Sequence, residues 1–316
     1  MAPRVVFMGT PDFGVPTLQY LAKHGVPLTG VVTQPDRPSG RGYQAAQSAV
    51  KIAAEARGLP VLQPENANDP AALQALADLR PEVIVVAAFG QILRPALLEL
   101  PRLGCINLHA SLLPHYRGAA PIQWALANGE TVTGVTVQKM AERVDAGAVL
   151  IQKTLTIGPD ETAPELFERL SDLGGPAVAE ALELLEATAG QGGTPQDEAR
   201  ATFAPRLKRE DGKLNWTWSG AKVHNHVRGF NPWPGTYAGL RSETLKILKT
   251  GRSDEPAPAG VQPGTVLRSE PEKGWLVAAG SGTTLWVRDV QCAGKKVMAA
   301  HAYACGHAFG AGDRLE

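Results

Sequence analysis

Two polar side chains stand at the end of one strand-like segment in the first half of the chain. The segment Cys105–His109 alternates apolar and polar residues, and alternate side chains of a strand lie on one face. Asn107 and His109 therefore share a face, opposite to Ile106 and Leu108. Ligands bind beyond the carboxyl ends of strands in open α/β sheets. There an amide can donate to an oxyanion and an imidazole can move protons, although the pair alone could also be a satisfied polar strand end.

A carboxylate that could orient the imidazole follows later in the chain. A catalytic histidine must be held in one tautomer, and its protonated form must be stabilised. Asp145 is the candidate, because it follows the predicted strand Val132–Met140 in a turn that could return to the carboxyl edge of the sheet. By itself Asp145 would be an ordinary solvated turn residue. The segment Ser111–Gln123, directly after His109, is predicted as a shaped loop because proline and glycine break its periodicity.

The trio of Asn107, His109 and Asp145 predicts acyl transfer without a covalent intermediate. No nucleophile motif stands beside the histidine, since Ser111 lacks a GxSxG elbow and Cys105 lies four residues earlier on the strand. Direct attack of one substrate on the other is therefore the simpler mechanism.

Other chemistries are disfavoured. The turn Gly9–Gly14 lacks the second glycine of GxGxxG and has no GK[ST], which argues against a nicotinamide dehydrogenase or an NTPase. His109, His115 and Asp145 match no zinc spacing, so we expect no metal. The three cysteines are odd in number and widely spaced, so they predict neither a disulfide framework nor a zinc pattern.

Short β-branched segments alternate with helical patterns in the first half. Strands are predicted at Val5–Met8, Val31–Thr33, Val83–Ala88, Cys105–His109 and Val132–Met140, and helices at Val15–His24, Gln47–Gly58 and Pro70–Leu79. This alternation indicates an α/β domain with a mostly parallel sheet covered on both faces. A further helix is predicted where Thr162 and Glu165 have capping-box spacing. Its apolar stripe consists of Val178, Ala181, Leu182 and Leu185.

The pattern changes after residue 189, so two domains are predicted. Residues 190–206 are rich in Gly, Gln, Thr and Pro and are predicted as a linker between a first domain, 1–189, and a second, 207–316. Short strands at Leu245–Leu248, Trp275–Ala278 and Thr284–Val287 favour a small β-barrel or sandwich in the second domain.

Charge and hydropathy limit the partners and the compartment. Residues 1–206 hold 16 Lys+Arg and 21 Asp+Glu, and residues 207–316 hold 15 and 10. The basic second domain suggests a polyanionic partner, although ordinary surface variation explains so mild an excess equally well. The longest apolar run, Val83–Phe89, is too short for a membrane span, and no secretory signal stands at the start, so a cytoplasmic protein is expected.

The sequence resembles the folate-dependent formyltransferases nearly end to end. The shared motifs, in order, are FMGTPDFGVPTL, VVTQPDRPSGRG, VVAAFGQIL, GCINLHASLLPHYRGAAPIQ, TGVT, DAG, FNPWPGTY, CAGKKVM and AGDRL. The resemblance implies a Rossmann-like formyltransferase domain and a C-terminal OB-like β-barrel. It also places the family's Asn, His and Asp site at Asn107, His109 and Asp145.

The same resemblance implies the substrates and their contacts. The donor would be 10-formyltetrahydrofolate, and the QPDRPSGRG and FNPWP motifs favour the α-amino group of methionine on initiator tRNA as acceptor. Folate-binding residues would be Phe89, Gly90, Gln91, Ile92, Ser111, Leu112, Leu113 and Pro114, which could otherwise be plain loop structure. A sugar-nucleotide N-formyltransferase and a non-catalytic RNA-binding module remain alternatives.

For tRNA, the resemblance points to the loop Gln34–Gln47. Arginine suits phosphate contact or stacking on an unpaired base. The tRNA-binding residues would be Arg37, Arg41, Lys208, Arg209, Lys213, Lys295 and Lys296, any of which could instead be solvated charge. Tyr43 and Gln44 stand where lysines are common, and Arg143 replaces a small residue near Asp145. A monomer is expected.

Overall fold

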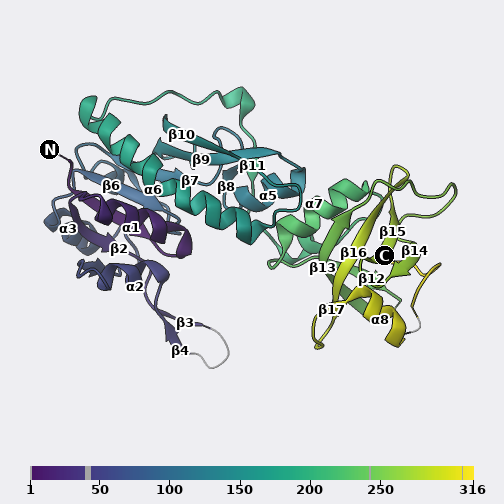
Figure 1. The fold of residues 1–316 in the computed structure, drawn as a ribbon. Helices are drawn as coiled ribbons and strands as arrows, with labels where there is room; N and C mark the ends of the chain where they lie inside the picture. The colour runs from purple at the N-terminus through teal and green to yellow at the C-terminus, as the bar shows by residue number, and fades with distance from the viewer. Residues whose placement is uncertain (1, 40–43, 242, 308) are drawn as a thin grey trace. The chain divides into compact units, whose positions relative to one another are not determined.

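The computed structural model describes residues 2–39, 44–241, 243–307 and 309–316 (Figure 1). By internal contacts the chain forms two compact units. The first unit contains residues 1–118, 132–155 and 167–204, and the second unit contains residues 119–131, 156–166 and 205–316. In the ranges described, no helix combines the length and the apolar character that a membrane crossing requires.

A seven-stranded sheet forms the centre of the first unit, in the order β10-β9-β7-β6-β1-β2-β5. Its strands are β1 (Val5–Gly9), β2 (Leu28–Val32), β5 (Val61–Leu62), β6 (Val83–Ala87), β7 (Cys105–His109), β9 (Val132–Lys139) and β10 (Val149–Thr156). The strands from β5 to β7 pair in parallel, and β9 runs antiparallel to β7. The mostly parallel sheet predicted from the alternating pattern is confirmed.

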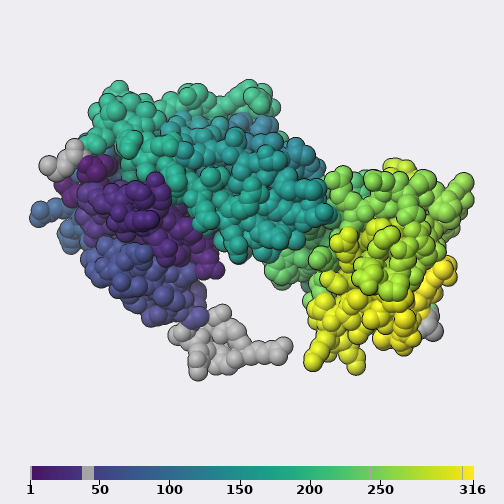
Figure 2. All heavy atoms as spheres, viewed as in Figure 1, coloured from purple at the N-terminus to yellow at the C-terminus, as the bar shows by residue number. Residues whose placement is uncertain are grey.

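Helices cover both faces of this sheet. They are α1 (Val15–Lys23), α2 (Ala49–Glu55), α3 (Pro70–Asp78), α4 (Pro95–Leu98) and α6 (Ala163–Ala187). α1 and α6, which lie in front of the strands in Figure 1, cover that face in the space-filling view (Figure 2). On the opposite face, Ile84, Val86 and Cys105 pack in one cluster with Leu76 of α3 and Leu97 of α4. Asn107 and His109 extend the Cys105 face, since they follow Cys105 at intervals of two.

α6 begins where the capping residues predicted it. The carboxylate of Glu165 accepts from the backbone N–H and the hydroxyl of Thr162, at 2.8 and 2.7 Å. The predicted apolar stripe is buried: Val178, Ala181, Leu182 and Leu185 are each at most 3% exposed. Burying a side chain of this size contributes about 1.5–3 kcal/mol, so the stripe holds the helix to the unit.

Two short strand pairs lie outside the central sheet of the first unit. β3 (Arg37–Ser39) pairs with β4 (Gln44–Ala46), and β8 (Arg117–Gly118) pairs in parallel with β11 (Phe203–Ala204). β11 falls in the segment predicted as a linker. The loop predicted over Ser111–Gln123 is wrong in part, because it contains β8 and because α5 (Pro121–Asn128) starts inside it. Proline fits the first turn of a helix, so Pro121 starts α5 rather than breaking it.

The second unit contains an antiparallel sheet in the order β12-β13-β16-β15-β14, with β17 paired to β16. Its strands are β12 (Tyr237–Leu240), β13 (Glu243–Arg252), β14 (Val266–Glu270), β15 (Gly274–Ala279), β16 (Thr283–Cys292) and β17 (Met298–Ala299). Fully buried Trp275 packs against Tyr303 and Phe309, with ring centroids 5.6 and 4.6 Å apart. The short strands predicted at Leu245–Leu248, Trp275–Ala278 and Thr284–Val287 are confirmed, because they lie within β13, β15 and β16. The helices α7 (Gly220–Phe230) and α8 (Ala300–His307) were not predicted.

Candidate active site

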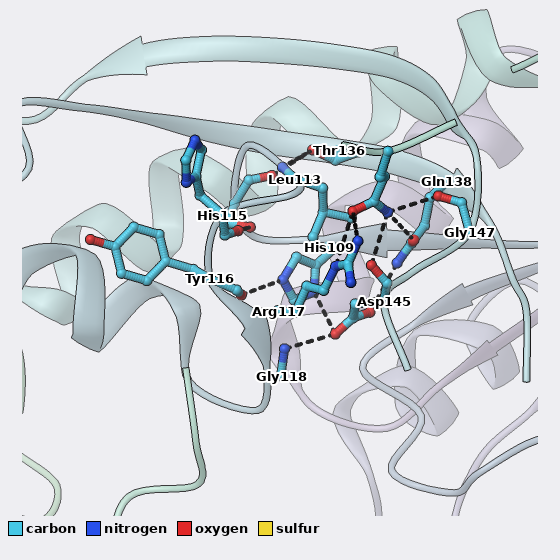
Figure 3. Close-up of polar contacts among 12 residues, drawn as sticks. His109, Leu113, His115, Tyr116, Arg117, Gly118, Thr136, Gln138, Asp145 and Gly147 are labelled. Carbon is cyan, nitrogen blue, oxygen red and sulfur yellow. Dashed lines mark hydrogen bonds and ion pairs between the residues drawn. The ribbon is translucent and has the colours of Figure 1, made fainter. Parts of the chain in front are cut away.

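His109 and Asp145 lie side by side in the first unit (Figure 3). Nδ1 of His109 is 3.6 Å from Oδ2 of Asp145, and the two side chains are only 7% and 10% exposed. Partly buried charges are screened less by salt and water than surface charges. The carboxylate can therefore stabilise a protonated imidazole beside it.

The other ring nitrogen of His109 faces a backbone acceptor. Nε2 lies 2.9 Å from the carbonyl oxygen of Tyr116. A carbonyl oxygen only accepts hydrogen bonds, so Nε2 carries the proton in this contact. Both ring nitrogens of His109 therefore face oxygen atoms.

Asn107 and His109 share their face of the sheet with residues of β9. In the β7–β9 pairing, Asn107 lies opposite Gln138 and His109 lies opposite Thr136. Residues directly opposite one another on paired strands project to the same side. Two amides and one imidazole therefore lie close together on one face of the sheet.

Asp145 is fixed through both of its carboxylate oxygens. Oδ1 accepts from Nε2 of Gln138, and Oδ2 accepts from the backbone N–H of Gly118, both at 2.9 Å. The backbone of Asp145 is left-handed, with φ of 54°, a conformation that aspartate tolerates better than most residues. The turn that carries Asp145 folds back onto β9, where Gly147 lies against the carbonyl of Lys139.

A buried arginine stands next to this arrangement. Arg117 is 2% exposed and pairs with both carboxylate oxygens of Glu198, at 2.9 and 3.1 Å. Hydrogen bonds from Arg117, together with those from Arg143, lower the pKa of Glu198 from 4.5 to about 2. Arg117 also donates twice to the side-chain oxygen of Gln196, at 3.1 and 2.8 Å.

The first predicted folate segment, Phe89–Ile92, is partly committed to the fold. Phe89 is 2% exposed and belongs to the core, and the amide group of Gln91 is bonded to two backbone groups at 2.8 and 3.0 Å. Gly90 has a φ of 90°, which favours glycine. Ile92 is 71% exposed, so its side chain is accessible to a ligand, whereas the carbonyl oxygens of Phe89 and Ile92 already accept hydrogen bonds within the protein.

The second predicted folate segment, Ser111–Pro114, is also held internally. Ser111 is fully buried, and its hydroxyl donates to the carbonyl of His115 at 2.6 Å. The backbone N–H of Leu113 donates to Thr136 Oγ1 at 3.0 Å. Leu112 and Pro114 are half-buried.

The predicted tRNA contacts do not lie together in one unit. Arg37, in the first unit, is exposed and pairs with exposed Glu65 at 3.2 Å, an ion pair of little energetic weight. Arg41 and Tyr43 lie outside the described residues. The remaining cations, all exposed and all in the second unit, are Lys208, Arg209, Lys213, Lys295 and Lys296.

The sequence patterns did not predict roles for Gln138, Arg117 and Gln196. An antiparallel pairing of Val132–Met140 with Cys105–His109 would have placed Gln138, but the pairing itself was not predicted. No sequence pattern indicated that Arg117 is buried or that Gln196 is its partner, because the two residues are 79 positions apart in the chain.

Two family models match the chain: "Formyl transferase" over residues 3–182, and "Formyl transferase, C-terminal domain" over residues 206–308. The chain therefore belongs to the formyl transferase family and contains both of its domains. Methionyl-tRNA formyltransferase of Geobacter metallireducens is 44% identical over 98% of this chain and 98% of its own length. That of Moorella thermoacetica is 47% identical over 99% of each chain.

Solved structures share the fold at low identity. WlaRD, described as a sugar 3N-formyl transferase, superposes with a TM-score of 0.66 at 18% identity, covering 94% of this chain and all of its own. HypX from Aquifex aeolicus in complex with tetrahydrofolic acid gives 0.60 at 16% identity, covering 96% of this chain and 47% of HypX. These likenesses support the Rossmann-like first domain followed by an antiparallel second domain.

Proposed function

We propose that the protein transfers the formyl group of 10-formyltetrahydrofolate to the α-amino group of methionine on initiator tRNA, for translation initiation. The observation that carries the proposal is identity of 44% and 47% to enzymes named for this reaction, over at least 98% of the chain. We further propose that it acts in the cytoplasm as a monomer.

The acceptor amine attacks the formyl carbon directly. An α-amino group has a reference pKa of about 7.7–8.0, so a neutral fraction exists at pH 7 and no strong base is needed. The new C–N bond forms as the formyl oxygen becomes an oxyanion, to which the Asn107 amide and the protonated His109 donate. A proton then passes from the new ammonium to N10 of the folate, and the C–N10 bond breaks. Tetrahydrofolate leaves.

Asp145 orients His109 and stabilises its charge. The 3.6 Å separation and the low exposure of both groups support this role. Sharing the Nε2 proton of His109 between the Tyr116 carbonyl and the formyl oxygen would place a donor at the reacting centre while the carbonyl still aligns the ring. Preorganised donors of this kind are worth about 2.7–4 kcal/mol of barrier each.

Substrate contacts follow from what is exposed. For folate, we assign residues 89–92 and 111–114, among which the side chain of Ile92 is the most exposed. For tRNA, we assign Arg37 and Arg41 from the first unit. The basic residues assigned from the second unit are Lys208, Arg209, Lys213, Lys295 and Lys296.

The destination of the formyl group tests the proposal. The protein is incubated with 10-formyltetrahydrofolate and, in parallel, with methionyl initiator tRNA, an amino-sugar nucleotide or no acceptor. Formyl-methionyl-tRNA as the favoured product is the expected result. Preferred formylation of the sugar nucleotide, or release of formate with no acceptor required, would overturn it.

A further inference from the structure

The segment Gln196–Ala204, which we call the return segment, lies against both members of the His109–Asp145 pair. Nothing in its sequence marks it, since it is polar and falls within the predicted linker. Its hydrogen bonds nevertheless reach the turn of Asp145 at one end and the backbone beside His109 at the other. This placement gives it a part in the site.

At one end, the amide of Gln196 ties down the Asp145 turn. Its nitrogen donates to the carbonyl oxygens of Asp145 and Gly147, at 2.9 and 2.7 Å, and lies 3.2 Å from the side-chain oxygen of Gln138. Its oxygen accepts both hydrogen bonds from Arg117, at 3.1 and 2.8 Å. A guanidinium only donates and a carbonyl only accepts, so only one orientation of the amide satisfies these contacts. Arg117 thus fixes Gln196, and Gln196 fixes the turn.

At the other end, Thr202 holds the backbone that contacts His109. The hydroxyl of Thr202 accepts from the N–H of Tyr116 at 2.8 Å, and the carbonyl of Thr202 accepts from the N–H of Arg117 at 2.9 Å. The carbonyl of Tyr116 is the partner of His109 Nε2, at 2.9 Å. Tyr116 has a φ of 60°, which few non-glycine residues adopt without support. Thr202 therefore braces the residue that orients the imidazole.

We propose that Gln196 and Thr202 are positioning residues of the formyl-transfer site. Gln196 holds the turn that presents Asp145, and Thr202 holds the carbonyl that aligns His109. The inference rests on the proposed function, because it concerns the same pair of side chains. It predicts that these residues act on the chemical step and not on substrate binding.

Two substitutions of Gln196 separate positioning of Asp145 from anchoring of Arg117. Gln196→Met removes every hydrogen bond at nearly constant length. Gln196→Glu keeps the acceptor for Arg117 but removes the donor to the turn. Both should lower kcat at least roughly 10-fold with little change in either KM, since small displacements of catalytic groups cost rate steeply. Native kcat in Gln196→Glu would overturn the role, because Gln196 would then only anchor Arg117.

Matched controls come from the same segment. Asp197→Ala removes the carboxylate that accepts from the Ala199 N–H at 3.0 Å, and this variant should keep native kcat. Thr202→Ser keeps the hydroxyl and should stay close to native, whereas Thr202→Val keeps the shape and should lose kcat. In an Asp145→Asn background, Gln196→Met should cause no further loss, because coupled residues are not additive. Additive losses would contradict the inference.

A measurement without turnover distinguishes this inference from the proposed function. The ring-nitrogen NMR signals of His109, assigned by their absence in His109→Gln, should shift in Gln196→Met and Thr202→Val. They should not shift in Asp197→Ala. Unchanged signals in the first two variants would overturn the positioning role. If the two variants show these shifts but the native protein does not formylate methionyl-tRNA, the proposed function is overturned and the positioning role stands.

Discussion

Replacing Gly147 with alanine should disable the site from within the turn that carries Asp145. A Cβ at Gly147 would lie 1.7 Å from the carbonyl oxygen of Lys139, a contact that has to open to about 3.0 Å. Lys139 ends β9 in the close-packed sheet and cannot move easily, so the turn that carries Asp145 and Gly147 has to move away from it. The required movement is about 1 Å, and displacements of that size can cost roughly 100-fold in rate. Overpacking should also cost about 1–3 kcal/mol of stability.

The assay is single-turnover formylation of methionyl-tRNA at saturating folate, paired with urea unfolding of the same preparation. The control is Gly30→Ala in β2, where the added Cβ would lie 2.6 Å from a methyl group of Leu79. That variant should lose stability and keep its rate. If Gly147→Ala folds and formylates at the native rate, the position of Asp145 does not govern the chemistry, and the reasoning is refuted.

Asn107→Ala and Asp145→Ala should each lower turnover at least roughly 100-fold in folded protein; near-native turnover would remove that residue from the mechanism. Burial lowers the pKa of His224 from its usual 6.5, so the unfolded chain takes up this proton first and stability falls as the pH drops below 6.5. His224→Gln should flatten that decline in the urea midpoint, and an equally steep decline would contradict the role of burial. Replacing Lys295 and Lys296 with alanine should reduce the salt slope of tRNA binding by about 1 for each of the two lysines that meets a phosphate, and an unchanged slope would exclude both.

Local patterning was sufficient to predict the strand that carries Asn107 and His109. The structure has β7 at Cys105–His109, the residues predicted, because alternation and a polar carboxyl end are properties of adjacent residues. The continuous apolar run of β6 was equally informative, since a strand buried on both faces leaves no polar positions.

Long-range hydrogen bonds account for what could not be predicted. Gln196 contacts residues 49 to 79 positions away in the chain, and no local pattern encodes such a partner. A segment without apolar periodicity was therefore interpreted as a linker, although its polar groups are fixed by the first unit. The helix α7 was missed although Ser219 caps it and Val223, Val227 and Phe230 have helical spacing, because the histidines and glycine between them make the segment polar on average.

The chain enters the second unit in three separate stretches, 119–131, 156–166 and 205–316. In that unit Trp124 of α5 packs edge-on against Phe230, with ring centroids 5.1 Å apart. A chimera of two relatives joined at one crossover near residue 190 would pair α5 from one parent with α7 from the other. To preserve this packing, a chimera must take all three stretches from the same parent.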